Sequence, residues 1–197
     1  MTKSTFFVEE DKILATLFEA GLDNLHLYKP GSSPIYSERL LSLLPDTTYN
    51  KITVHGHFYL KDEYGLAGLH LDDSAQQPPV GYKGRISRTC RNIAELKDMK
   101  RQSAYVFLDN VFSPNAERPD NGSLNMNELE AASERGLIDK KVYALGGVTA
   151  DNIQLARDLG FGGVVIGNDL WKHFDIHNER DYKDLIAHFE RLKKLVY

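Results

Sequence analysis

The stretch Tyr143–Trp171 decides the fold and reads YALGGVTADNIQLARDLGFGGVVIGNDLW. It contains an apolar strand that ends in Gly146 and Gly147, a helical segment, and a second apolar strand that ends in Gly167 and Asn168. Glycine-rich turns after strands expose backbone N–H groups, which bind phosphate without a charged side chain. The stretch predicts two neighbouring parallel strands that share a phosphate site.

The segment between these strands has the sequence signals of a short helix. Thr149 is a suitable N-cap residue directly after the glycine pair, and Gly160 is a suitable terminating residue. We therefore predict a helix over Ala150–Leu159.

Short apolar runs alternate with amphipathic segments along the rest of the chain, as in repeated βα units around a parallel sheet. The predicted strands are Asn24–Tyr28, Lys51–His55, Ala67–Leu71, Tyr82–Ser87, Ala104–Leu108, Lys141–Leu145 and Gly163–Ile166. The other predicted helices are Glu9–Ala20, Tyr36–Leu44, Phe58–Tyr64, Asn92–Arg101, Asn127–Arg135 and Tyr182–Val196.

Strand–helix alternation leads either to an open doubly wound sheet or to a closed eight-stranded barrel. No G-x-G-x-x-G motif follows the first strand, whereas a phosphate site after strands 7 and 8 is typical of the barrel. We predict an α/β fold of the TIM (β/α)8-barrel type, with Gly163–Ile166 as strand 8. Only MTKSTFFV precedes the first helix, so strand 1 is predicted to be missing or reduced, unless the sequence as given starts late.

Composition and charge limit the classes of function. The chain has 197 residues, of which 42% are hydrophobic, and a net charge of −4, which fits one domain over residues 1–197 without a basic field for nucleic acid. No segment has the length of apolar sequence that a signal peptide or a membrane span needs. Cys90 is the only cysteine, so we expect a cytoplasmic protein. An open sheet edge would favour a homo-oligomer.

Six motifs in order resemble the thiamine phosphate synthase family, which also includes thiazole tautomerase relatives. The motifs are GLDNLHLYKPG, GLAGLHLDD, GRISRTCRNIAEL, AYVFLDNVFSP, ALGGVTADNI and GFGGVVIGNDLW. The resemblance implies a transferase that couples hydroxymethylpyrimidine diphosphate with thiazole phosphate, releases pyrophosphate and uses Mg²⁺. The alternative is a family member without synthase activity that binds a phosphorylated ligand or isomerises a thiazole phosphate.

The resemblance implies a thiazole-phosphate site at the two glycine-rich turns. Gly146 and Gly147 match the family's Gly-Gly pair, while Gly167 and Asn168 take the place of its usual Ile or Val followed by Ser. We predict that these four residues bind the substrate phosphate. A valine at position 147 is expected to abolish this binding.

The side that would bind the diphosphate departs from the family pattern. The family's Gln-x-Arg-x-Lys motif falls on His26, Tyr28 and Pro30, with Lys29 one position away. We assign His26, Tyr28, His55 and Arg88 to the possible diphosphate side.

Catalysis itself is assigned to two residues. Ser87 matches a serine of the family, and Lys29 remains near a lost lysine position. Arg91 lies close to Ser87 and, like Arg88, offers replacement positive charge.

Magnesium ligands are also exchanged. The family's carboxylates do not recur at their matched positions, but Asp72 and Asp73 lie close by and are assigned as a weak Mg²⁺ site. A diphosphate-binding lysine of the family is matched by Glu117 in the segment 114–117. Asp109-Asn110 replace the pair that contains the histidine of tautomerases, so these exchanges leave turnover open.

Four histidines lie in or beside the predicted second, third and fourth strands of the barrel. His26, His55, His57 and His70 could together bind a transition metal. Because alternate strand residues face opposite sides of a sheet, we expect that all four cannot face one point, and that packing explains them better.

Overall fold

The computed structural model describes residues 1–112, 124–174 and 182–196. The chain divides into two compact units. Unit 1 comprises Met1–His70, Pro78–Arg85 and Leu170–Glu190, and unit 2 comprises Leu71–Gln77, Ile86–Asp169 and Arg191–Tyr197.

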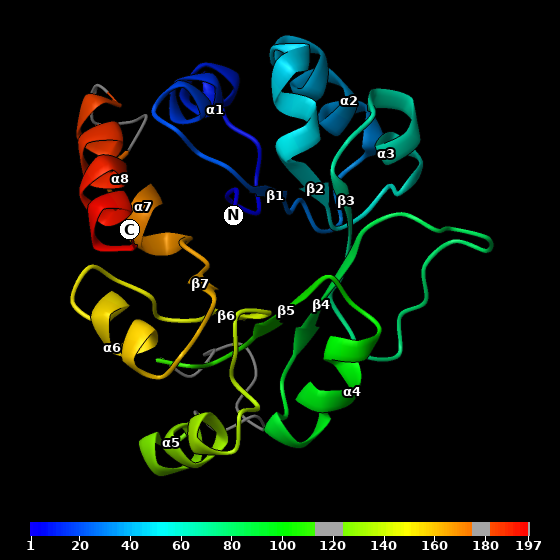
Figure 1. The fold of residues 1–197 in the computed structure, drawn as a ribbon. Coiled ribbons are helices and arrows are strands. Elements are labelled where there is room, and N and C mark those ends of the chain that lie inside the picture. The colour runs from blue at the N-terminus through cyan, green and yellow to red at the C-terminus, as the bar shows by residue number, and fades with distance from the viewer. Residues whose placement is uncertain (113–123, 175–181, 197) are drawn as a thin grey trace. The chain divides into compact units, whose positions relative to one another are not determined.

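Unit 1 contains three short parallel strands that pair in chain order. They are β1 (Leu25–Leu27), β2 (Ile52–Val54) and β3 (Gly68–Leu71), of which the last residue belongs to unit 2. The helices of this unit are α1 (Glu10–Glu19), α2 (Pro34–Leu43), the 3-10 helix η1 (Asp46–Lys51) and α3 (Tyr59–Tyr64). Figure 1 shows α1, α2 and α3 on the outer side of these strands.

Helix α1 forms where the sequence predicts it, because one stripe of its surface is apolar. Ile13, Leu14, Leu17 and Phe18 recur at helical spacing and are all buried. Helix α7 (Asn168–Trp171) begins in unit 2 and enters unit 1 at Leu170, and the first part of α8 (Lys183–Val196) also belongs to unit 1.

The N-terminal residues take the place of a first strand beside β1. The Thr2 N–H donates to the carbonyl of His26 at 3.0 Å, and the Thr2 hydroxyl oxygen accepts from the N–H of Tyr28 at 3.0 Å. The indole N–H of Trp171 donates to the carbonyl of Met1 at 2.9 Å, and the Phe7 ring packs edge-on against that indole. Strand 1 is therefore reduced to one pairing residue, as predicted.

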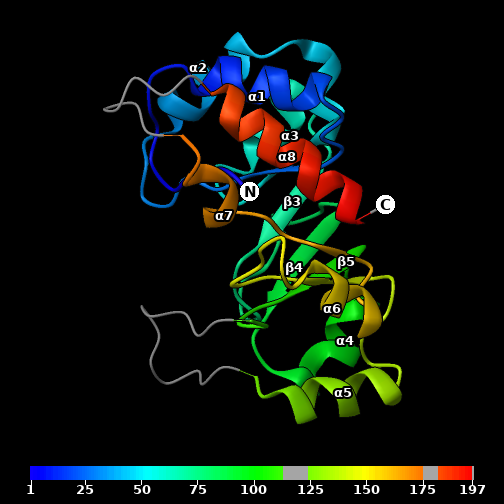
Figure 2. The same cartoon turned by 90° about the vertical axis from the view of Figure 1, so that its left-hand side faces the viewer.

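Unit 2 contains the remaining four strands, again parallel and in chain order. They are β4 (Ile86–Cys90), β5 (Tyr105–Leu108), β6 (Val142–Ala144) and β7 (Gly163–Val164). The helical elements are η2 (Ile93–Glu95), α4 (Leu96–Arg101), α5 (Met126–Glu134) and α6 (Ile153–Asp158). Figure 2 shows α4, α5 and α6 flanking β4 and β5.

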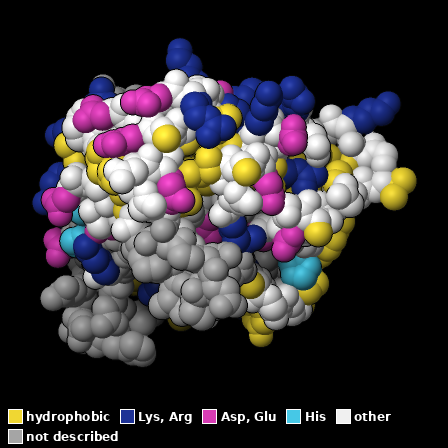
Figure 3. Space-filling view, turned by 90° about the horizontal axis from the view of Figure 1, so that it is seen from below, with side chains coloured by type: hydrophobic (Ala, Val, Ile, Leu, Met, Phe, Trp, Pro, Cys, Tyr) yellow, Lys and Arg dark blue, Asp and Glu magenta, His cyan; other side chains and the backbone are white. Residues whose placement is uncertain are grey.

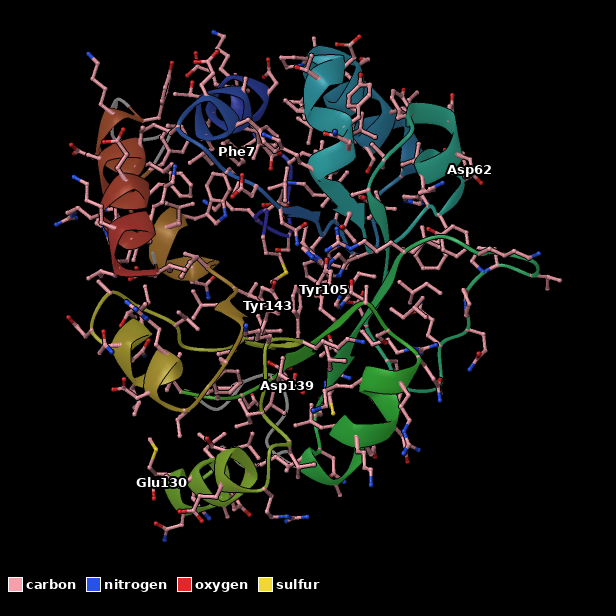
Figure 4. All side chains as sticks on the ribbon, in the orientation of Figure 1. Phe7, Asp62, Tyr105, Glu130, Asp139 and Tyr143 are labelled. Atoms are coloured by element: carbon pink, nitrogen blue, oxygen red, sulfur yellow. The ribbon has the colours of Figure 1, made fainter. Side chains whose placement is uncertain are left out.

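The core of unit 2 lies between strands and helices. Val106, Leu108 and Val142 from the strands pack with Leu96 and Leu129 from the helices. The opposite face carries aromatic rings: Tyr105 and Tyr143, labelled in Figure 4, lie 5.3 Å apart between ring centroids. Val106, Leu108 and Val142 therefore face the helices, while Tyr105 and Tyr143 face away from them.

The predicted strand Tyr82–Ser87 is wrong by about four residues, because β4 runs from Ile86 to Cys90. Gly81 has a φ of 79°, and the Tyr82 N–H donates to the Pro79 carbonyl at 3.0 Å in a turn. The preceding segment is largely exposed, whereas Ser87 through Cys90 are buried. Burial, and not β-propensity alone, sets the bounds of this strand.

The predicted N-cap of α6 is also wrong. Asn152, and not Thr149, is the N-cap residue, because the chain extends beyond Gly147 before the helix begins. Gly160 ends this helix as predicted, with a φ of 85° and its N–H donating to the carbonyl of Arg157 at 2.9 Å. Two short helices, η1 and α7, were not predicted.

The described surface has mixed charge. On the face that Figure 3 shows, Lys and Arg side chains are interspersed with Asp and Glu side chains. Within the described ranges, no helix has the length and apolar character that crossing a membrane requires.

Candidate functional site

The loop after β6 needs glycine at two consecutive positions. Gly146 has a φ of 93° and Gly147 a φ of 67°, a region that residues with a side chain rarely adopt. A Cβ atom on Gly146 would lie only 3.0 Å from the backbone nitrogen of Asn110 and 3.1 Å from its Cα. The glycine pair therefore allows this loop to approach the loop after β5 closely.

Hydrogen bonds fix the carbonyl groups of both glycines. The Phe112 N–H donates to the Gly146 carbonyl at 3.1 Å, and the Asn152 side-chain amide donates to the Gly147 carbonyl at 2.8 Å. Among the described residues, none accepts a hydrogen bond from the N–H of Gly147. A fixed backbone N–H without a protein partner is suited to bind an anion.

In the loop between β7 and α7, unlike the loop after β6, the backbone conformation does not require glycine. The φ of Gly167 lies outside the left-handed region, and a Cβ atom there would meet nothing within 4 Å. Gly167 is partly exposed and Asn168 is exposed. Packing of the free protein therefore does not require glycine at position 167, and the open space beside its backbone suits a bound phosphate.

The residues of β4 lie on two faces of the sheet, so Ser87 and Arg88 point to opposite sides. Arg88 pairs in register with Val106, whose side chain lies in the helix-facing core, while Ser87 pairs with Tyr105 and Thr89 with Phe107. Ser87 is buried near the start of β4, not at its carboxyl end. Thr89 lies two residues closer to that end on the same face as Ser87, which moves the candidate hydroxyl to Thr89.

Arg88 points toward α4 and not toward the glycine loops. It lines a cavity of about 270 Å³ together with Glu95, Asp98 and Met99 of the helical segment. Its guanidinium donates to the carbonyl of Gln76 at 3.0 Å, while its Nε is buried and has no hydrogen-bond partner among the described residues. Burial lowers the pKa of Arg88. This position does not support the predicted diphosphate contact.

Arg91 offers a better placed cation in unit 2. It follows β4 directly, and its Nε lies 3.7 Å from a carboxylate oxygen of Asp109, which follows β5. The arginine side chain is 22% exposed, so the pair is accessible at the carboxyl ends of the strands. Extending the predicted strand to Cys90 would have identified Arg91 as the first residue after it.

Asp72 and Asp73 lie just after β3 in unit 2 and supply carboxylate oxygens, the ligand type that Mg²⁺ prefers. One Asp73 oxygen accepts a hydrogen bond from the Ala75 N–H at 2.8 Å. The donor chemistry fits Mg²⁺, and Asp72 and Asp73 are the residues that would hold it. Glu117, matched to a lost lysine, lies outside the described residues.

Lys29 is buried and already paired. Its ammonium lies 2.6 Å and 2.9 Å from the two carboxylate oxygens of Glu10 and donates to the Thr5 carbonyl at 2.9 Å. Both side chains are 2% exposed. Burial raises the pKa of Glu10 and lowers the pKa of Lys29, although the charge of each partner opposes the shift. The geometry assigns Lys29 to a buried ion pair, so a catalytic role for it stays a prediction.

His26 and His55, predicted for the diphosphate side, are buried in contact with each other. The His26 Nδ1 and the His55 Nε2 are 2.8 Å apart. The Tyr28 ring packs edge-on against the ring of His55 at 5.2 Å. His26 and His55 are therefore interior residues of unit 1, whereas Tyr28 is partly exposed. A diphosphate role for these three residues stays a prediction.

Comparison with solved structures relates the chain to a family of known proteins. No family model matches the chain, and no curated protein matches it. A solved structure of thiamine phosphate pyrophosphorylase from Bacteroides thetaiotaomicron is 44% identical to this chain, with a TM-score of 0.88 over 98% of this chain and 94% of that one.

More distant structures share the fold alone. Thiamine phosphate pyrophosphorylase from Pyrococcus furiosus has a TM-score of 0.74 at 16% identity, covering 95% of this chain and 89% of that one. A 3-hexulose-6-phosphate synthase has a TM-score of 0.60 at 13% identity, covering 95% of both chains. The predicted TIM (β/α)8-type fold with a reduced first strand is confirmed. The 44% identity over nearly the whole length shows that the chain is thiamine phosphate synthase-like and belongs to the thiamine phosphate pyrophosphorylase family.

Proposed function

We propose that this protein couples hydroxymethylpyrimidine diphosphate with thiazole phosphate to form thiamine phosphate and pyrophosphate. The observation that supports it best is the pair of glycine loops after β6 and β7, with the N–H of Gly147 lacking a described partner and open space beside Gly167. The 44% identical pyrophosphorylase gives the substrate class. The proposal includes one catalytic domain over residues 1–197 and a cytoplasmic location.

The glycine loops would bind the thiazole phosphate. The backbone N–H groups of Gly147, Gly167 and Asn168 are hydrogen-bond donors that need no side chain, so the site tolerates the exchange of a side chain at position 168. Gly146 contributes by allowing the close turn. This half-site holds the nucleophile's phosphate and thereby orients the thiazole ring.

Bond formation needs little acid–base chemistry. The C–O bond between the pyrimidine methylene and the diphosphate breaks, and the diphosphate leaves with the electron pair. The thiazole nitrogen then forms a bond to the methylene carbon with its own electron pair. Stabilisation of negative charge on the leaving group is therefore the main demand on the protein.

Arg91 and Thr89 would meet that demand in unit 2. The Arg91 guanidinium provides positive charge directly after β4, although Asp109 neutralises part of it. The Thr89 hydroxyl is a hydrogen-bond donor on the same face. Asp72 and Asp73 would hold Mg²⁺, which supplies charge neutralisation to the diphosphate when it is bound.

A coupled assay tests the proposal. Purified full-length protein with both substrates and Mg²⁺ should produce thiamine phosphate and pyrophosphate in equal amounts. If no product appears above a buffer control while thiazole phosphate still binds by calorimetry, the synthase proposal is wrong and a binding function replaces it.

Gly167→Val gives the matched test of the phosphate site. Because the free protein has space for a side chain there, the variant should fold as the parent does and keep its melting temperature. Loss of hydrogen bonds to a charged phosphate should weaken thiazole phosphate binding by about 10- to 100-fold. Gly147→Val is a poorer test, since a φ of 67° strains valine whether or not a ligand binds.

A further inference from the structure

Three histidines of unit 1 lie on one face of β1, β2 and β3. In the register of the strands, His26 lies beside Thr53 and Val54 beside Leu69, so His55 lies beside His70. The exposed fractions are 3% for His26, 7% for His55 and 0% for His70. The four histidines do not all face one point, as expected, because His57 lies outside this group. The other three share a face, because the strands align residues of equal orientation.

The distances between these rings suit a shared ligand. The His26 Nδ1 and His55 Nε2 are 2.8 Å apart, and the three ligand nitrogens all lie within 4.8 Å of one another. Ring centroids are 5.0 Å apart for His26 and His55, 5.0 Å for His26 and His70, and 4.1 Å for His55 and His70. A tetrahedral ion with bonds of roughly 2.0–2.1 Å separates its nitrogen ligands by about 3.4 Å, so small ring rotations would bring all three nitrogens into range.

Burial of His26 favours its neutral form, the form in which an imidazole binds metal. Burial lowers the pKa of His26 well below its ordinary value, and the neighbouring His55 and His70 lower it further. Thr53 lies in register beside His26, and its hydroxyl is buried without a described hydrogen-bond partner. On the same face of the strands, this oxygen is suited to an outer contact with a bound water.

We propose that His26, His55 and His70 bind a divalent transition-metal ion such as Zn²⁺. Three imidazole nitrogens without a carboxylate in the group favour Zn²⁺ or Co²⁺ over Mg²⁺, which prefers oxygen ligands. Three buried polar rings clustered within one sheet face also need a reason beyond packing, since aliphatic side chains fill such space without a desolvation cost. The two proposals name different residues: the histidines belong to unit 1, and the residues proposed for the synthase reaction belong to unit 2.

Cobalt provides the direct test. The full-length protein, stripped of metal with a chelator and dialysed, should bind one equivalent of Co²⁺ and develop the visible absorption of a four-coordinate ion. Zn²⁺ should displace it. His55→Gln keeps a polar side chain of similar length and should bind at least about 100-fold more weakly, since even outer-shell changes cost about 10- to 100-fold.

His57→Gln is the matched control, because His57 lies two residues away, outside the three-histidine group, with its ring nitrogen 3.0 Å from the Ser32 carbonyl. It should bind Co²⁺ as the parent does. Proton NMR of the cobalt-loaded parent adds a readout that requires no variant: three imidazoles should give strongly shifted resonances. Absence of stoichiometric binding, equal weakening in both variants, or no shifted imidazole resonances would each overturn the site and leave a hydrogen-bonded histidine cluster.

Discussion

In unit 2, the loops after β6 and β7 offer backbone N–H groups beside open space, whereas in unit 1 the strands β1 to β3 present a face filled by buried histidines. The same chain thus contains one region suited to an anion and one region from which an anion is excluded. Lys29, a cation that the sequence assigns to catalysis, is paired with Glu10 of α1 at 2.6 Å in the interior of unit 1. Sites made of backbone persist through side-chain exchange, while sites made of side chains do not.

The largest expected effect tests whether Lys29 belongs to the interior of unit 1. Glu10→Ala leaves a buried ammonium without its carboxylate, which should destabilise the protein by about 3–5 kcal/mol. Urea unfolding measures this directly. The control Lys12→Ala removes a surface pair, with side chains 62% and 42% exposed, and should cost at most about 1 kcal/mol. Equal effects would show that Lys29 is not held as described.

The next largest effect separates the two glycine loops. Gly146→Ala places a Cβ against the Asn110 backbone and forces a φ of 93° on alanine, so unfolding free energy should fall by about 1–3 kcal/mol. Gly167→Ala should leave it unchanged, because the added methyl group meets nothing within 4 Å. Chemical unfolding of the two variants compares them, and a similar loss in both would contradict the difference between the loops.

Buried His26 should make the free energy of unfolding depend on pH, with an effect of intermediate size. Because burial and its two histidine neighbours depress the pKa of folded His26, the unfolded state binds the proton first as pH falls below about 6.5. Stability is therefore fully present above that pH and is lost at about 1.4 kcal/mol per pH unit below it. Urea unfolding of metal-free protein at pH 7.5, 6.5 and 5.5 should show this slope in His57→Asn and a reduced slope in His26→Asn.

The last comparison concerns turnover and the two arginines of the β4 region, Arg88 and Arg91. Arg88→Met removes a guanidinium that lines the cavity beside α4 and donates to the Gln76 carbonyl, so stability should fall by about 1–3 kcal/mol while turnover changes little. Arg91→Met removes the accessible cation and should lower kcat/KM at least about 10-fold, since hydrogen bonds to charged groups contribute roughly 1.5–3 kcal/mol. If Arg88→Met lowers kcat/KM more than Arg91→Met does, the diphosphate contact that the sequence analysis assigns to Arg88 is correct.

The alternation of apolar runs was sufficient to predict the fold, because each strand and its following helix have local signals. Six of the seven predicted strands coincide with observed ones, and only the bounds around Tyr82 were misplaced. The aromatic and β-branched residues there have high strand propensity. The turn at Gly81 and the burial of Thr89 and Cys90 nevertheless shift the bounds of β4 toward the C-terminus. Burial is a tertiary property, so local propensity could not give it.

The site was less predictable than the fold. The glycine loops were identified because their signal is local: glycine follows a short apolar strand in both, and at Gly146 and Gly147 the backbone has a positive φ. The partners of Lys29 and the meeting of His26 with His70 depend on which residues neighbouring strands align. That register comes from the whole sheet, and the sequence of one strand does not contain it.

Trp171 is the only tryptophan of the chain, and its indole is bound to the carbonyl of Met1 and shielded by Phe7. Its fluorescence therefore serves as a built-in optical signal for one event, the docking of the N-terminal residues beside β1. Its emission would shift to longer wavelength when the N-terminal residues leave β1. Such a shift at denaturant concentrations that leave far-UV ellipticity unchanged would show that this release precedes global unfolding. No attached dye is needed to follow it.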